Sequence, residues 1–222
     1  MIYKLKLPVD NRFLWLAAVL ALPLQPLAFY YVRLPLIHLV TVYVHTTPAV
    51  YQGLMTIYAP LTEEPAKLIP LLIPVIRRDI RVENFVRYAL AIGLAFAIGE
   101  MWFIAHDLAR NPAIAAEPFY RLYGYFAERL MTCVYHSAFL SMTLWQLRRR
   151  VMLGLAGAMA LHWLCNFPIF LMSWNVGELG YATWLEIVNC WNGFYSIACL
   201  ALLSWFGSRQ VVSGMNLQSA RF

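Results

Sequence analysis

The segment FVRYALAIGLAFAIGEMWFI, residues 85–104, decides the fold class of this chain. Its length matches the roughly 20 apolar residues that a helix needs to cross the hydrocarbon core of a membrane, and only Arg87 and Glu100 in it are charged. Comparable apolar segments lie at 13–32, 122–147, 151–174 and 181–206. They run far beyond a barrel strand and lack its two-residue alternation. The sequence therefore predicts an all-α, polytopic transmembrane helix bundle.

The composition supports the same class. The 222 residues are 62% hydrophobic and 13% charged, whereas a soluble globular chain is about half apolar and about a quarter charged. Soluble folds are excluded by this shortage of charge, and intrinsic disorder needs the opposite composition. The length allows about six to eight spans and no additional soluble domain. We expect a single integral membrane domain over residues 1–222, with the motif-bearing core at about 54–174.

The distribution of charge predicts the orientation in part. The net charge is +6, but the arginines gather in short clusters between apolar segments, at 77–81 and 148–150. This is the positive-inside pattern of cytoplasmic loops, so the charge indicates a lipid bilayer and no nucleic acid as partner. We expect about seven spans, counting a weaker apolar stretch at 34–58 and a segment that runs to Ile76. Seven full spans place Lys4 and Lys6 outside, against the rule; a re-entrant or surface helix at 34–58 places them inside.

Several ionisable residues interrupt the apolar segments, and each one in a membrane span indicates a functional site. Four of them lie 12 or 13 residues from the nearest basic anchor: Glu64, Glu100, His136 and His162. At about 1.5 Å per residue, all four lie roughly 18–20 Å above the inner basic belt. Scattered structural residues have no reason to agree in height. Two carboxylates and two imidazoles are therefore expected to meet in one pocket.

Helical periodicity adds companions to this set, because residues three, four and seven apart share a face. Lys67 is placed to pair with Glu63 or Glu64, and Arg129 lies on the face of His136. Asn166 lies one turn after His162. Within both 85–104 and 151–174, small residues recur at four-residue spacing. This predicts that these two helices pack closely and bring Glu100 towards the 162–166 face.

Structural interpretations exist for each motif taken alone. Residues 62–65, Thr-Glu-Glu-Pro, also suit the first turn of a helix, and His162 with Asn166 suits a polar clasp between helices. His38 and His45 are better explained by a polar helix face than by metal ligation. Only the agreement in depth favours a shared functional site over these interpretations.

In order, the chain presents Glu63-Glu64-x-x-Lys67, Phe96-x-x-x-Glu100, Arg129 with His136, and His162-x-x-x-Asn166. This set resembles the PrsW family of intramembrane proteases, whose pattern is EExxK, FxxxE and two histidine-bearing helices. That family is related to the CAAX prenyl protease and bacteriocin-processing (CPBP/ABI) family, from whose EExxxR, FxxxH, HxxxN pattern this chain departs at Lys67 and Glu100. The resemblance covers roughly residues 62–166.

The resemblance implies a glutamate-dependent or metal-dependent membrane endopeptidase. Its expected substrate is a membrane-anchored protein, such as a single-pass anti-sigma factor, and its expected location is the inner or plasma membrane of a prokaryotic cell. Peptide hydrolysis needs an activated water and a stabilised oxyanion. We expect Glu63 or Glu64 to polarise the water and Glu100 to orient it. The side chains of His136, His162 and Asn166 are expected to stabilise the oxyanion or protonate the leaving amine, while Lys67 and Arg129 serve as charge partners or position the substrate.

A zinc version uses the same residues differently, because two histidines and a glutamate with an open water position form a catalytic zinc site. Its ligands would come from a set of four: Glu64, Glu100, His136 and His162. Two other functions stay open. A proton- or ion-coupled transporter would use Glu64 and Glu100 as carriers, although no inverted repeat is visible. A structural or immunity-type membrane protein would use the polar residues only as helix clasps.

Overall fold

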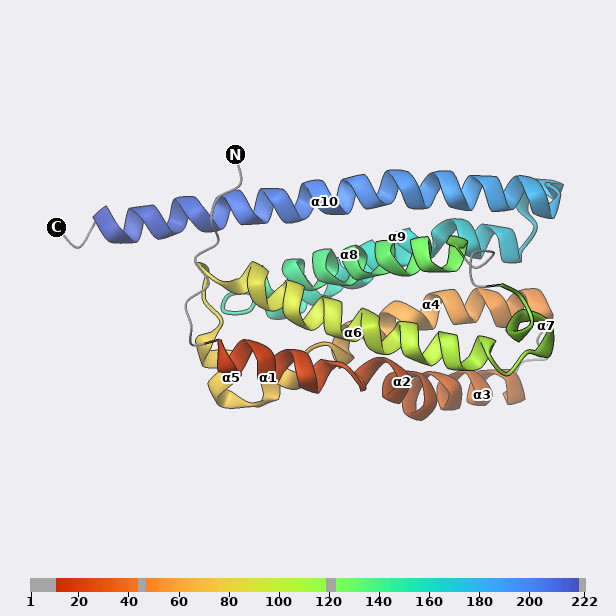
Figure 1. Cartoon of the computed structure of the whole chain (residues 1–222), viewed down its shortest axis with the longest axis horizontal. Helices are drawn as coiled ribbons and strands as arrows, with labels where there is room; N and C mark the ends of the chain where they lie inside the picture. Colours follow the sequence, from red (N-terminus) through yellow and green to blue (C-terminus); the bar gives the residue numbers. More distant parts are fainter. Residues whose placement is uncertain (1–10, 44–46, 119–122, 220–222) are drawn as a thin grey trace.

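The computed structural model describes residues 11–43, 47–118 and 123–219, and every regular element in these ranges is a helix (Figure 1). The predicted all-α class is confirmed. Five helices of 19 or more residues dominate: α4 (Pro48–Ala66), α6 (Phe85–Leu108), α8 (Tyr123–Trp145), α9 (Val151–Ser173) and α10 (Tyr181–Ser219). Shorter helices join them at the two ends of the bundle.

Three of the described helices, α6, α9 and α10, are long and apolar enough to cross a membrane, and a bent N-terminal pair makes a fourth candidate. The count of seven spans is thus not established by length and composition. Large apolar side chains cover the outer surface of the bundle; Trp102 on α6 is 74% exposed and Ile197 on α10 is 69% exposed. Such a surface requires an apolar surrounding, and the chain is a membrane protein.

The N-terminal segment differs from the prediction of separate apolar stretches at 13–32 and 34–58. The four elements α1 (Arg12–Ala21), α2 (Leu24–Ala28), the π-helix η1 (Phe29–Arg33) and α3 (Leu34–Tyr43) follow one another as a single rod, bent by 41° between α1 and α2. The proposed break at Arg33 is wrong because the chain passes through it in a π-helical turn. The second predicted stretch is instead divided between α3 and α4.

The segment that was expected to run to Ile76 is also shorter than predicted. Helix α4 ends at Ala66, and a 3₁₀ turn, η2 (Ile69–Leu72), and a short helix, α5 (Pro74–Asp79), follow. Prolines at 70 and 74 supply no backbone N–H, so they interrupt the helix there. Residues 62–65 lie in the last turns of α4, and the interpretation of this motif as a helix start is wrong.

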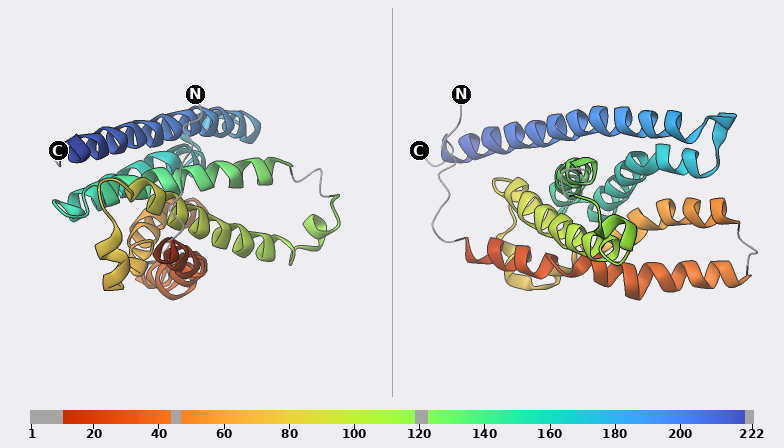
Figure 2. Two further views of the ribbon diagram at one scale, coloured as in Figure 1. Left: turned by 60° about the vertical axis from the view of Figure 1, so that its left-hand side comes forward. Right: turned by 45° about the vertical axis from the view of Figure 1, so that its right-hand side comes forward.

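Helix α8 is the centre of the bundle, since it packs against α6, α9 and α10, while α4 packs against α9 (Figures 1 and 2). The small-residue runs serve α8 rather than a direct contact between α6 and α9. A Cβ atom added at Gly93 of α6 would lie 2.6 Å from the Cα of Ser137 on α8. One added at Gly154 of α9 would lie 2.9 Å from the carbonyl oxygen of Met142, also on α8.

The two ends of the bundle differ. The start of α1, the short α5 and the C-terminal end of α10 lie at one end, which we name the α5 end (Figure 1). At the opposite end lie α7 (Pro112–Ala115) and the turn with η4 (Val176–Glu178), and we name it the α7 end. Three of the long helices therefore begin at the α7 end and run towards the α5 end: α4, α8 and α10.

Candidate active site

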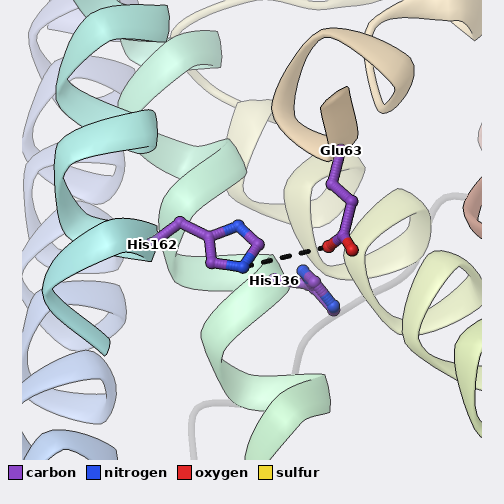
Figure 3. Close-up of side chains that lie close together, drawn as sticks. All are labelled: Glu63, His136 and His162. Atoms are coloured by element: carbon purple, nitrogen blue, oxygen red, sulfur yellow. Dashed lines mark ion pairs between the residues drawn. The ribbon is translucent and has the colours of Figure 1, made fainter. Parts of the chain in front are cut away.

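Three side chains from three helices converge in the interior: Glu63 of α4, His136 of α8 and His162 of α9 (Figure 3). One ligand atom from each lies within 4.8 Å of the others. The Nε2 of His162 is 3.9 Å from Oε2 of Glu63. All three residues are buried. We call these three residues the central triad.

A second carboxylate, that of Glu64, is hydrogen-bonded to the ring nitrogen of His162 that lies away from Glu63. The Nδ1–H of this histidine donates to Oε1 of Glu64 over 2.6 Å, and Lys67 Nζ donates to the same oxygen over 2.6 Å. Glu64 and Lys67 are almost completely inaccessible, at 1% and 0% exposure. The Glu64 carboxylate accepts both hydrogen bonds, so Nδ1 of His162 carries a proton towards Glu64 and Nε2 is the ring nitrogen that faces Glu63.

His136 is held in the same manner from another side. Its Nε2–H donates to Oε2 of Glu100 over 2.9 Å, and Arg129 Nη1 donates to Oε1 of Glu100 over 3.0 Å. Arg129 also bonds the carboxylate of Glu128. The other ring nitrogen, Nδ1, is buried and has no hydrogen-bond partner in the part of the chain that the structure describes. Each histidine thus belongs to a chain of cation, carboxylate and imidazole.

Glu63 has a cation of its own, which the sequence analysis did not identify. Arg33, at the end of the π-helical turn, is 6% exposed and donates through Nη2 to Oε1 of Glu63 and through Nε to Thr62. A lone arginine inside an otherwise apolar run was the available signal, because such a charge needs a partner within the membrane. It falls between two predicted segments, and was therefore overlooked.

Aromatic rings close the site towards the α5 end. Lys67 Nζ lies 5.2 Å from the ring centroid of Phe96 and 5.6 Å from that of Phe139. Phe139 stacks on His162 at 5.3 Å, and Phe96 meets His136 edge-on at 5.0 Å. Cation–π contacts stabilise the buried ammonium, and the rings fix both imidazole planes.

A cavity of about 210 Å³ adjoins the central triad. From the triad it extends along α4 to Thr56, along α8 to Glu128 and along α9 to Ile169. Each of these positions is nearer the α7 end than the triad residue on the same helix (Figure 1). The half-buried Asn166 also lines it, whereas the Glu64 side chain is not part of the lining. The cavity is therefore directed towards the α7 end.

The chemistry of the triad is that of a cation site. Its carboxylate oxygens and one nitrogen of each imidazole are possible metal ligands, and Nδ1 of His136 has no hydrogen-bond partner among the described residues. Two histidines and one glutamate are a donor set suited to catalytic zinc, and carboxylates behind the histidines are its usual second layer. The residues therefore fit a divalent metal ion. The set differs from the predicted four ligands, since Glu64 and Glu100 occupy the outer nitrogens.

The structure brings together all eight residues selected from the sequence, and the convergence predicted from their depth is confirmed. Two details differ: Lys67 pairs with Glu64 and not with Glu63, and Glu100 contacts His136 instead of His162. His38 is exposed on α3, as expected for a polar face, and His45 lies outside the described residues. Roles in catalysis stay predictions.

Models of known protein families, curated proteins and solved structures were compared with the chain, and none of them matches it.

Proposed function

We propose that this chain is a PrsW-like intramembrane endopeptidase that hydrolyses a peptide bond in a membrane-anchored protein substrate, at the inner or plasma membrane of a prokaryotic cell. One observation carries the proposal. The donor atoms of Glu63, His136 and His162 converge within 4.8 Å beside a polar cavity, inside a bundle of membrane helices. A structural clasp needs neither a cavity nor a buried nitrogen without a partner, and hydrolysis needs both a place for water and groups to activate it.

The central triad is the set of residues that would hold a zinc ion. Bound there, zinc would supply a water of lowered pKa and polarise the substrate carbonyl. Glu64 and Glu100 each accept a hydrogen bond from one imidazole and so fix which ring nitrogen faces the cavity. Arg33 donates to the Glu63 carboxylate at the cavity wall, and Glu63 rather than Glu64 is the glutamate placed to bind the metal ion or, without one, to contact the water.

Asn166 completes the site. Its side chain lines the cavity one helical turn beyond His162, towards the open end. An amide N–H directed at the carbonyl oxygen stabilises the negative charge that develops there during water attack. The histidines, whose N–H groups point away towards Glu64 and Glu100, accept or ligate at the cavity and do not donate there. This revises the expectation that they stabilise the oxyanion by hydrogen bonding.

The proposal counts six membrane crossings, with the rod α1–α3 and α6, α9 and α10 as the candidate spans and with the polar site helices α4 and α8 as the other two. This is the lower end of the expected range. Six crossings put the start of α1 and the end of α10 on one side together with α5 and the arginines at 148–150, in agreement with the positive-inside rule. The cavity then opens away from the cytoplasm, and the scissile bond lies in the outer half of the membrane.

Transport is less well supported. A carrier needs access to its site from both sides in turn. Here Lys67, Phe96 and Phe139 occupy the side towards α5, and the cavity is directed to the α7 end.

The proposal is tested by N-terminal labelling and mass spectrometry of membrane proteins from cells that express the wild type or a variant. New N-termini within or beside the apolar segments of single-pass proteins should appear with the wild type. They should be absent with three variants, each measured for expression and thermal stability: Glu63→Gln, His136→Ala and His162→Ala.

Glu186→Gln is the matched control, because it makes the same chemical change at an exposed position of α10. It should leave the pattern of N-termini unchanged. Cleavage that survives in all three site variants would overturn the peptidase proposal.

A further inference from the structure

A second cavity, of about 430 Å³, lies at the α5 end of the bundle, away from the cavity of the central triad. We name it the basic cavity. It is formed where α6 begins, α8 ends and α10 passes. Its volume is within the range of roughly 300–1,000 Å³ that is typical of small-molecule sites.

Four arginines line the basic cavity: Arg81, Arg148, Arg149 and Arg209. A neighbouring cavity that shares Arg148 adds Arg77 and Arg78. The carboxylate of Asp79 at this end already accepts a hydrogen bond from the hydroxyl group of Tyr88, over 2.6 Å. None of the described residues that line the basic cavity is acidic, and guanidinium groups bind phosphate oxygens in bidentate geometry.

Part of this arrangement is fixed by the protein. Arg148 Nη2 donates to the carbonyl oxygens of Arg78 and Ile80 over 3.1 and 3.0 Å, which ties the loop after α8 to the loop after α5. The guanidinium of Arg209 lies over the ring of Trp205 at 5.3 Å. A site with preplaced cations loses less conformational entropy when an anion binds.

The rest of the basic cavity is apolar. Phe85, Leu144 and the rings of Trp145 and Trp205 form its walls. The two indoles meet at 5.7 Å and are 42% and 41% exposed, and tryptophan is enriched where a membrane protein crosses the headgroup level. From Trp205, exposed apolar residues continue along the same face of α10 towards the bilayer interior, at Ala201, Ile197 and Phe194. A ligand here meets cations at one end and an apolar helix face at the other.

We propose that the basic cavity binds the headgroup of an anionic phospholipid, with the phosphate between Arg81 and Arg149 and the acyl chains along the exposed face of α10. The positive-inside rule accounts for arginines at this end, but it does not account for their gathering around a cavity with tryptophan walls. Basic pockets between helices at the cytoplasmic surface are the form that anionic lipid sites take.

The test is native mass spectrometry of the purified full-length protein in detergent, titrated with palmitoyl-oleoyl phosphatidylglycerol or with the matching phosphatidylcholine. We expect tighter binding of the anionic lipid by about tenfold or more, since two or more arginines would each contribute about fivefold. Arg149→Gln and, separately, Arg81→Gln should each weaken phosphatidylglycerol binding by about fivefold. Arg150→Gln should not, because Arg150 belongs to the same loop but not to the cavity lining.

Three results would overturn the proposal: equal affinity for the two lipids, equal effects of Arg149→Gln and Arg150→Gln, or binding of soluble glycerol 3-phosphate as tight as that of phosphatidylglycerol. The last would show that the site takes a free phosphate ester and not a lipid. A thermal unfolding curve of each variant in phosphatidylcholine separates loss of the lipid site from misfolding, and two independent arginine variants keep the test decisive if one does not fold.

Discussion

Both histidines of the candidate site are oriented by a carboxylate that is in turn held by a cation from the same or a neighbouring helix. The chain Lys67–Glu64–His162 comes from α4 and α9, and the chain Arg129–Glu100–His136 comes from α8 and α6. The outer carboxylates fix the orientation of both rings, so the second nitrogen of each ring is the one that is placed to contact a ligand in the cavity. This repeated arrangement is the residue-level basis of the proposed function.

Removing one member of a buried ion pair leaves the other without compensation. Lys67→Met should lower the free energy of unfolding by about 3–5 kcal/mol, because Glu64 then remains as a buried unpaired charge. Thermal or chemical unfolding of the purified protein measures this. The double variant Lys67→Met with Glu64→Gln should recover much of the stability without recovering proteolysis, since His162 has lost its orienting carboxylate. A double variant as unstable as the sum of the single changes would contradict the pairing.

Substitution of Asn166 tests a catalytic role that is separate from metal binding. Asn166→Ala should lower kcat by about 10²–10³-fold, the usual loss for one oxyanion donor, and zinc binding should be unchanged. A purified substrate identified by the N-terminal labelling experiment provides the rate measurement. An increase in KM at constant kcat would show that Asn166 binds substrate uniformly and does not act in the transition state.

At the scale of elements, the close approach of α6 to α8 brings Glu100 within reach of His136. Gly93→Leu should therefore be strongly destabilising, because its Cβ alone would lie 2.6 Å from the Ser137 backbone; overpacking of this kind costs roughly 1–3 kcal/mol or more. The rate of proteolysis should fall by more than the loss of folded protein explains, since α6 must move away from α8 and carry Glu100 away from His136. Unfolding and cleavage assays are compared for the same preparation.

Gly193→Leu in α10 is the matched control, because no atom lies within 4 Å of a Cβ added there. Stability and cleavage should change little. Equal losses in the two variants would show that the close packing of α6 and α8 is not what positions Glu100.

The sequence predicted the residues of the site better than the packing of the helices. Depth in the membrane follows from counting along each helix, so the agreement of Glu64, Glu100, His136 and His162 could be calculated without a structure. The choice of neighbour could not, because runs of small residues indicate that a helix can be approached closely but not which helix approaches. The role of Arg33 was missed for a related reason: whether a lone arginine ends a span or enters it depends on a partner elsewhere in the chain.

Across the whole molecule, the cavity of the central triad is directed towards the α7 end, and the arginine clusters lie at the α5 end. The proposed orientation predicts that a membrane-impermeant thiol reagent added outside the cell labels Ile169→Cys in a variant without native cysteines, because this residue lines the cavity near the α7 end. Thr143→Cys is the control; it is 1% exposed and lies on α8 beyond Phe139, towards the α5 end. Labelling of Ile169→Cys only after the cells are made permeable would reverse the proposed orientation.

The most direct test of the central claim is the zinc content of the purified full-length protein after equilibration with zinc chloride and removal of free metal, measured by inductively coupled plasma mass spectrometry. The proposed site predicts about one zinc per chain in the wild type, consistent with a single three-ligand site. It predicts retention of that zinc in Glu186→Gln and a large loss in Glu63→Gln, His136→Ala and His162→Ala. Full proteolytic activity of a zinc-free wild type, or equal zinc binding by all five proteins, would contradict it.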